Sequence, residues 1–367
     1  MLKLLFVDDE PDVLEPVIEA LSEQCRCEVR GFDDAEDALF DISPDIVVLD
    51  LLDGGATSEA ENLGSTTYRR IWETRFCPII VYSAQPELLS DKEAEHPFVR
   101  YVKKGATSVG ELREGVKAFE PHADAVRHTE QRIRSEISSA LRDVSREIFE
   151  HYQSDEDRSN AIVRSAQRRL AALMDDLSRH GEKLQGWEQF VSPPIGSDLC
   201  LGDIIRKAEG SPEDPRDFFV VLTPSCDLVC SNGRQPRVSD VLVAGCESLP
   251  DAIGRSALKG MSQSKLKGRI IGTMLSPGFF GEFLPIPTLT GRIPSMAANF
   301  KRLHLLPVSH VVSETPEYER IASIDSPFRE LVSWGYLQTS CRPGLPDRDF
   351  ELWRDEILEV LKAKEGD

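Results

Sequence analysis

Apolar and polar positions alternate in a regular order along the first 120 residues. Apolar runs that predict buried strands lie at 2–7, 45–50, 78–84 and 98–104, and a strand-like alternation lies at 27–32. Segments with the apolar spacing of a helix lie around 11–21, 35–42, 65–74 and 108–119. The strict alternation of the two kinds of element predicts an α/β domain. Its sheet is expected to be five-stranded, parallel and doubly wound, with helices on both faces.

The pattern changes after residue 120. Residues 121–186 contain almost no Gly or Pro, and their apolar side chains recur at helical spacing in two stripes separated by the polar stretch QSDEDRSN. The stripes are Val126, Ile133, Ile137, Leu141, Val144 and Ile148, then Ala166, Leu170, Leu173, Leu177 and Leu184. Two such helices with a short polar link predict a helical hairpin or coiled-coil spacer. Its apolar seam packs within the hairpin or across a homodimer.

Gly and Pro become frequent again from residue 192. Strand-like runs follow at 217–223, 240–246, 269–275 and 302–308, and an amphipathic helix is predicted at 349–363. The chain of 367 residues is long enough for two or three domains. We therefore expect a first domain at 1–120, a helical spacer at 121–188 and a mostly β domain with a terminal helix at 192–367.

Composition narrows the class of protein. The formal net charge is −20, and residues 1–120 hold 12 Lys and Arg against 26 Asp and Glu. No segment is basic overall, which argues against a nucleic-acid partner because phosphate binding needs clustered cations. No apolar run reaches the ~18 residues of a membrane helix, and the acidic N-terminus does not fit a signal peptide. The eight cysteines form no CxxC pair, so we expect a cytoplasmic protein with reduced thiols and no membrane partner.

Polar side chains follow four of the predicted strands. Asp8 and Asp9 follow the first, Asp50 the third, Ser83 ends the fourth and Lys104 the fifth. The carboxyl ends of parallel strands meet at one edge of the sheet, so these groups are expected to converge there. Three adjacent carboxylates repel one another unless a hard cation lies between them, and Mg²⁺ prefers oxygen ligands. With a lysine and a hydroxyl nearby, this arrangement predicts transfer of a phosphoryl group to Asp50.

The same residues carry a resemblance to a known family. Residues 1–120 resemble the receiver domain of two-component response regulators in four motifs, which are VDDE at 7–10, DIVVLDL at 45–51, VYSA at 81–84 and YVKKGA at 101–106. The four occur together in the order and spacing of that family. The resemblance implies a histidine kinase as partner and phosphorylation of Asp50.

The resemblance also implies roles for individual residues. Mg²⁺ is bound by Asp9, Asp50 and the carbonyl of Leu52, with Asp8 assisting through water. The phosphoryl group contacts Ser83 and Lys104, and Tyr101 is the switch aromatic. Two departures from the family pattern are Gly54, where a proline is usual, and a long acidic loop at 53–65.

The C-terminal domain resembles only loosely an uncharacterised bacterial family whose start reads GDI…V-x-S-x-x-CD, and for which an SH3-like barrel is expected. Its sharpest local feature is Cys226 with Asp227. These residues fit a nucleophile with His304 or His310 as base, a Zn²⁺ site with Cys230 and Cys246, or a buried thiol beside a turn-capping aspartate. The buried thiol is the favoured interpretation.

A histidine and a run of basic residues could each have a function, but we interpret both as structural. His128 lies on the first spacer helix but lacks the acidic or proline neighbours of a phosphorylated histidine, so we interpret it as solvated. A basic run, Lys259, Lys265, Lys267 and Arg269, is interpreted as a solvated loop because no aromatic residues are interleaved with it.

The C-terminal domain also lacks a recognisable helix-turn-helix or catalytic motif, and whether it is an enzyme is left open. The sequence thus predicts a response regulator that controls a non-DNA-binding output domain. Two alternatives stay open. The first is a phosphate sink that buffers a two-component pathway, as in phage defence. The second is a cysteine-dependent effector enzyme gated by the receiver.

Overall fold

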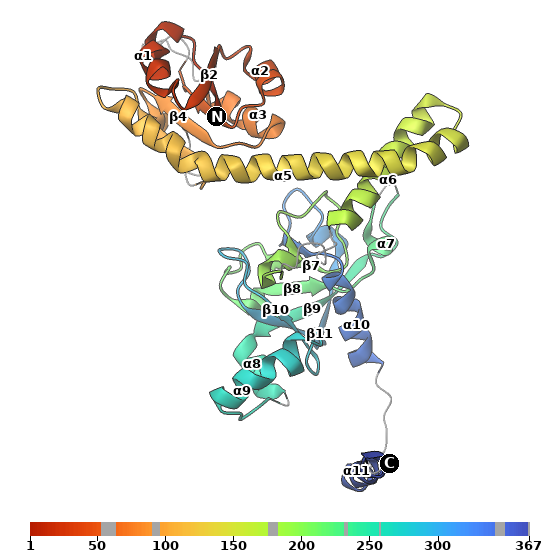
Figure 1. Cartoon of the computed structure of the whole chain (residues 1–367). Coiled ribbons are helices and arrows are strands. Elements are labelled where there is room, and N and C mark those ends of the chain that lie inside the picture. Colours follow the sequence, from red (N-terminus) through yellow and green to blue (C-terminus); the bar gives the residue numbers. More distant parts are fainter. Residues whose placement is uncertain are drawn as a thin grey trace. The chain divides into compact units, whose positions relative to one another are not determined.

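The computed structural model describes residues 1–52, 64–89, 96–174, 183–230, 234–256, 258–341 and 349–365 (Figure 1). The chain divides into two compact units, residues 1–181 and 182–367. Within the described residues no helix is long and apolar enough to cross a membrane.

The first unit is built on a five-stranded parallel sheet with the order β2-β1-β3-β4-β5. Its strands are β1 (Leu2–Val7), β2 (Cys25–Arg30), β3 (Ile46–Leu49), β4 (Ile79–Ser83) and β5 (Val99–Lys103). This is the flavodoxin-like order, in which the chain reverses direction between β1 and β3. The predicted doubly wound α/β fold is therefore confirmed.

Helices cover both faces of this sheet. One apolar core lies between the sheet and the helices α1 (Pro11–Leu21) and α5 (Ser108–His151), and it includes Leu14, Phe6 and Leu112. The other lies between the sheet and the helices α2 (Ala35–Ile42) and α3 (Gly64–Thr74). Successive side chains of the central strand β3 alternate between the two cores, which explains why this strand is apolar throughout.

The last helix of this domain does not end where the domain was expected to end. We predicted a helix at 108–119 and a separate spacer helix after residue 120, but α5 is one helix of 44 residues that includes Pro121. The helix α6 (Asp155–Met174) packs against the C-terminal half of α5, and Ala140, Ile148 and Ala161 are buried between the two helices. A predicted seam residue, Leu177, lies outside the described residues.

The second unit is mostly antiparallel β, as predicted. Its seven-stranded sheet has the order β10-β11-β9-β8-β7-β12-β6. The strands are β6 (Phe190–Val191), β7 (Asp203–Lys207), β8 (Phe218–Val221), β9 (Asp240–Ser248), β10 (Phe283–Ile286), β11 (Met296–Pro307) and β12 (Tyr318–Ile324). Apolar cores lie on both of its faces.

Two expectations for this unit are wrong. The sheet has β10 and β6 as its edges, so it is an open seven-stranded sheet and not a small SH3-like barrel. The apolar run at 269–275 is helical, because it continues the helix α9 (Gln263–Ile270) into a π-helical turn at Ile271–Leu275. The other helices of the unit are α7 (Ser225–Leu228), α8 (Leu249–Arg255), α10 (Phe328–Ser340) and α11 (Phe350–Glu365).

Candidate phosphoacceptor site

Three carboxylates meet where the central strands of the first unit end. Asp8 and Asp9 follow β1, and Asp50 follows the neighbouring parallel strand β3. One oxygen from each of these three side chains lies within 4.8 Å of the other two. Asp8 and Asp50 are only 3% and 5% exposed, so their charges are largely shielded from water. Burial of three adjacent carboxylates is unfavourable without a cation between or beside them.

Lys104 supplies one such cation. Its Nζ donates hydrogen bonds to Asp8 Oδ2 at 2.7 Å and to Asp50 Oδ2 at 2.5 Å. The backbone amide of Lys104 bonds to the carbonyl of Ser83 at 3.0 Å, which fixes the end of β5 beside β4. Desolvation acts to lower the pKa of the Lys104 ammonium, but the two carboxylates outweigh it and hold that pKa above its ordinary value.

Backbone amides fix the orientation of two of the carboxylates. Asp50 Oδ1 accepts hydrogen bonds from the amides of Leu51 at 2.6 Å and Leu52 at 3.3 Å, which leaves Oδ2 directed to the lysine. Asp8 Oδ1 accepts a bond from the amide of Glu10 at 2.9 Å. Burial raises the pKa of the Asp8 carboxyl, and the bonds from Lys104 and Glu10 oppose that shift.

The donor set fits Mg²⁺. All three clustered side chains offer carboxylate oxygens, which this ion prefers, and the single charge of Lys104 compensates only part of their combined charge. Among the described residues no other group of three acidic, histidine or cysteine side chains comes so close together. Asp8, Asp9 and Asp50 are therefore the residues that would hold the metal.

The remaining predicted site residues lie around this cluster. Ser83 is fully buried at the end of β4, in the strand next to Asp50, and its hydroxyl accepts a long bond from the amide of Gln85 at 3.4 Å. Tyr101 is half-buried on β5 and packs against the core on the α2–α3 side. Leu52 is buried and immediately precedes the undescribed residues 53–63. Gly54 and most of the predicted loop at 53–65 therefore lie outside the described residues, while the last two positions of that loop begin α3.

One further residue at the site, Gly64, was not predicted from the sequence. It begins α3, is buried, and its amide bonds to the carbonyl of Leu51 at 3.2 Å. A Cβ atom here would lie 2.3 Å from the Leu51 Cα and 2.4 Å from the carbonyl oxygen of Asp50. Only a residue without a side chain allows this approach to the backbone of Asp50 and Leu51.

We expect Gly64→Ala to displace the backbone at Asp50. The crowding should lower the free energy of unfolding by about 1–3 kcal/mol and slow phosphorylation from acetyl phosphate. Chemical denaturation and intact-mass spectrometry measure the two effects. Gly110→Ala on α5 is the matched control, because a Cβ there meets nothing within 4 Å. Equal behaviour of the two variants would contradict the assigned role of Gly64.

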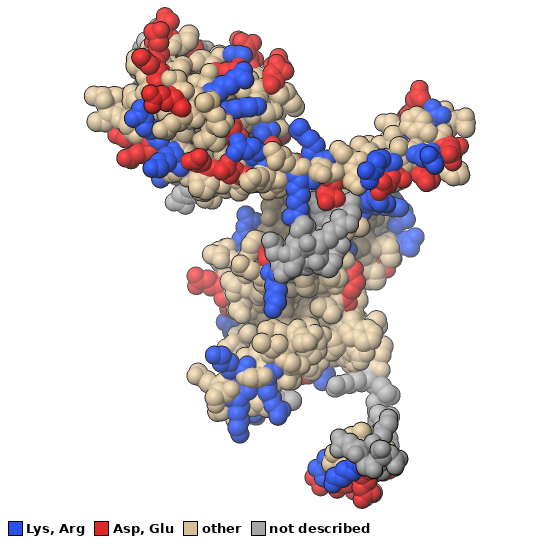
Figure 2. Space-filling view, viewed as in Figure 1, with Lys and Arg blue, Asp and Glu red and all other residues tan. Residues whose placement is uncertain are grey.

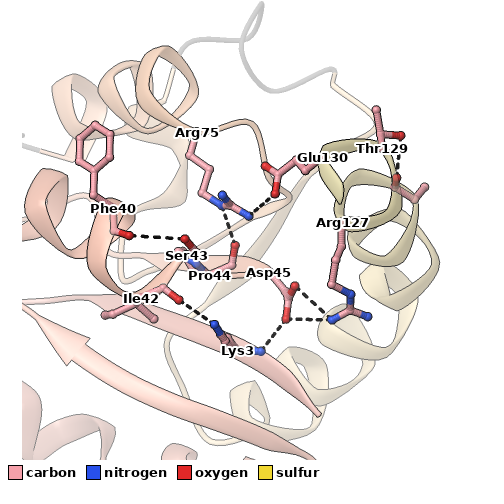
Figure 3. A network of polar contacts seen from close by, with 11 residues as sticks. Lys3, Phe40, Ile42, Ser43, Pro44, Asp45, Arg75, Arg127, Thr129 and Glu130 are labelled. Carbon is pink, nitrogen blue, oxygen red and sulfur yellow. Dashed lines mark hydrogen bonds and ion pairs between the residues drawn. The ribbon is translucent and has the colours of Figure 1, made fainter. Parts of the chain in front are cut away.

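A second polar network, which the sequence did not predict, connects α5 to the end of the sheet opposite Asp50 (Figure 3). Arg127 Nη1 donates to Asp45 Oδ1 and Oδ2 at 3.3 and 3.4 Å, and the amide of Lys3 donates to Asp45 Oδ2 at 2.9 Å. Glu130 forms an ion pair with Arg75 at 2.7 Å, and Arg75 also bonds to the carbonyl of Pro44. The helix therefore contacts the residues that precede β3, whereas Asp50 follows the same strand.

Among the described residues no hydrogen bond joins Cys226 to His304 or His310. Cys226 is exposed, and its Sγ contacts the Asp227 carboxylate at 3.8 Å. His310 pairs with Glu317, and His304 packs edge-on against a phenylalanine ring. The cysteines of the proposed Zn²⁺ site, Cys226, Cys230 and Cys246, form no cluster in the described part of the chain. The favoured interpretation of Cys226 as a buried thiol is wrong, because the helix α7 presents its side chain to solvent.

The side chain of His128 is exposed on α5, which agrees with its interpretation as a solvated histidine.

Solved structures provide a comparison for the N-terminal third. The *Thermotoga maritima* response regulator TrrA bound to Mg²⁺ and beryllofluoride is 27% identical, with 32% of this chain and 99% of that chain covered and a TM-score of 0.27. TrrA in complex with the histidine kinase ThkA is 26% identical over 33% and 99% of the two chains, also at a TM-score of 0.27. The beryllofluoride-activated receiver domain of *Klebsiella pneumoniae* RstA is 24% identical over 32% and 97%, with a TM-score of 0.25.

The structural neighbours of this third are response regulator receiver domains. No protein-family model and no curated protein sequence matches the chain. We refer below to the five-stranded α/β domain as the receiver-like domain.

Proposed function

We propose that the chain is a response regulator whose Asp50 accepts a phosphoryl group from a histidine kinase in the presence of Mg²⁺. The observation that carries this proposal is the cluster of the buried Asp8 and Asp50 with the half-buried Asp9, in which Lys104 bonds to Asp8 and Asp50. The phosphoryl change would control the second unit through α5. Of the comparison proteins, TrrA has been solved in complex with the histidine kinase ThkA and, separately, with Mg²⁺ and beryllofluoride.

The proposed reaction is a displacement at phosphorus. An oxygen of the Asp50 carboxylate forms a bond to phosphorus, and the bond from phosphorus to the donor histidine nitrogen breaks. That nitrogen keeps the electron pair, and because the other nitrogen of the phosphohistidine ring carries a proton, the imidazole leaves in its neutral form. The amides of Leu51 and Leu52 hold Oδ1, so Oδ2 is the oxygen positioned to attack once Lys104 releases it. Lys104 then neutralises the incoming phosphoryl oxygens, and bound Mg²⁺ would supply additional positive charge there.

The contacts of α5 favour control of an output over a phosphate sink. A sink needs only the acceptor, whereas here the strand that carries Asp50 at one end contacts, through Asp45 at the other end, a helix that continues into the spacer. We propose that a change at Asp50 alters the contact between Asp45 and Arg127. Ser83 and Tyr101, in their switch role, provide a second route from Asp50 to the spacer.

The test is direct. The purified full chain is incubated with acetyl phosphate, with Mg²⁺ or with EDTA, and the mass of the intact protein is recorded. We expect the mass of one phosphoryl group to be gained only when Mg²⁺ is present. Beryllofluoride with Mg²⁺ should protect the peptides that contain Asp50 from hydrogen exchange. Failure of both the adduct and the protection would overturn the proposed function.

The proposed coupling predicts that Arg127→Gln separates phosphorylation from its effect on the spacer. Labelling of Asp50 should be unchanged, because Arg127 lies at the opposite edge of the sheet. The amides of α5 near residue 127 should exchange faster by about fivefold, as expected for loss of roughly 1 kcal/mol of local stability. They should also lose their response to beryllofluoride.

Hydrogen exchange followed by mass spectrometry measures this outcome. Arg132→Gln serves as the control, because Arg132 is exposed on the same helix. If the beryllofluoride response of the spacer survives in Arg127→Gln, the Asp45–Arg127 contact does not transmit the signal.

A further inference from the structure

One stretch of the second unit has a charge opposite to that of the whole protein. Between Asp251 and Glu282 the sequence contains five cations, Arg255, Lys259, Lys265, Lys267 and Arg269, and no acidic residue. The chain as a whole carries a net charge of −20. Figure 2 shows these blue side chains gathered over α8 and α9. We call residues 259–275 the basic helix surface.

In the structure most of this stretch is helical and not a loop. We expected a solvated loop for the basic run and a strand for 269–275, but α9 and its π-helical continuation form one helical segment from Gln263 to Leu275. Its inner side is anchored by Met274, which is buried in a small core with Ala252 and Phe283. The cations on this segment are therefore presented at fixed positions on its outer side.

Among the described residues, the cations of the surface have no acidic partners. Lys259, Lys265, Lys267 and Arg269 are all exposed, and in the described part of the chain none of them forms an ion pair. Arg255 differs, because it pairs with the buried Glu247. Four uncompensated positive charges on a strongly acidic protein favour an anionic partner.

Exposed aliphatic side chains lie next to these charges. Ile271 is 68% exposed and Leu275 is 53% exposed, and both belong to the same helical segment as Lys267 and Arg269. Nucleic-acid phosphates would use the cations but not the aliphatic groups, and no aromatic side chain is available on the segment for base stacking. An anionic lipid surface uses both, because cations bind the headgroups and aliphatic groups enter the interface.

We propose that the basic helix surface binds peripherally to membranes that contain anionic lipids. The expectation of no membrane partner rested on the lack of a spanning segment, and peripheral binding requires no such segment. The inference is independent of phosphorylation at Asp50, because it concerns only residues of the second unit.

Vesicle sedimentation of the full chain tests this proposal. The protein should sediment with vesicles of phosphatidylcholine mixed with phosphatidylglycerol, should not sediment with phosphatidylcholine alone, and should be released by salt. The triple variant Lys265→Gln, Lys267→Gln, Arg269→Gln should bind about a hundredfold more weakly, since each cation near the surface contributes about fivefold. The pair Ile271→Ser, Leu275→Ser should bind about tenfold more weakly with its charge unchanged.

A matched control separates local from overall charge. The triple variant Arg132→Gln, Arg164→Gln, Arg168→Gln changes the net charge equally at exposed positions of the first unit and should bind as the wild type does. Circular dichroism establishes that every variant is folded. The proposal is overturned if wild-type protein ignores phosphatidylglycerol or if both triple variants weaken equally. Tight binding to duplex DNA or RNA that the serine pair leaves unchanged would overturn it in favour of a nucleic-acid site.

Discussion

Asp50→Asn should abolish uptake of a phosphoryl group from acetyl phosphate. An amide has neither the charge nor the nucleophilic oxygen that the displacement requires. The fold should survive, because the amide oxygen can still accept the hydrogen bonds from Leu51 and Leu52. Removing one of three crowded carboxylates relieves repulsion, so we expect the free energy of unfolding to be unchanged or raised by about 1 kcal/mol. Intact-mass spectrometry and chemical denaturation measure the two quantities.

Asp45→Asn is the matched control for this experiment. Asp45 is also a buried aspartate of the receiver-like domain and also pairs with a cation. It lies at the start of β3, however, whereas Asp50 lies at the end of that strand. Its asparagine variant should be labelled to the same extent as the wild type. Stoichiometric labelling of Asp50→Asn, with the phosphoryl group mapped to Asp8 or Asp9, would show that the acceptor has been assigned to the wrong residue.

The sequence predicts this site well because the chemistry depends on strand ends. Once β1, β3, β4 and β5 are recognised as parallel neighbours, the residues that follow them must meet at one edge of the sheet. This convergence does not depend on the conformation of the loops. Apolar runs such as 45–50 leave little choice of secondary structure, since a buried central strand is the element they fit. Asp8, Asp9, Asp50 and Lys104 therefore lie together as expected.

Features that depend on the approach of distant segments were not predictable in the same way. The need for glycine at position 64 arises only when α3 begins against the backbone of Leu51. The pairing of Asp45 with Arg127 joins residues far apart in the sequence, and neither has a distinctive neighbourhood of its own.

The run 269–275 was assigned wrongly for a different reason. Its apolar residues Ile270, Ile271 and Leu275 have a composition typical of strands, and a short apolar run does not reveal its period. The preceding polar segment from Gln263 starts a helix, and the run extends it. In the structure only Met274 of that extension is fully buried, which explains why no clear alternation or helical stripe marks it.

Lys104→Gln should destabilise the receiver-like domain strongly and make it dependent on Mg²⁺. Lys104 is the cation that bonds to both Asp8 and Asp50, and its side chain is only 17% exposed. Removing one partner from a buried ionic group costs about 3–5 kcal/mol, because the remaining charges stay desolvated and repel one another. On the proposed function Mg²⁺ would bind the same carboxylates and should recover much of that loss, through binding to the folded state alone.

Lys103→Gln provides an internal control one residue away. Lys103 is exposed at the end of β5, so its replacement should change local stability by less than about 0.5 kcal/mol and should not alter the response to Mg²⁺. Hydrogen exchange of peptides from β1 and β3, with Mg²⁺ or EDTA, reports the opening free energy of this domain separately from the second unit. If Lys103→Gln and Lys104→Gln behave alike, or if Mg²⁺ stabilises neither, then the three carboxylates are not compensated by Lys104 and do not form a cation site.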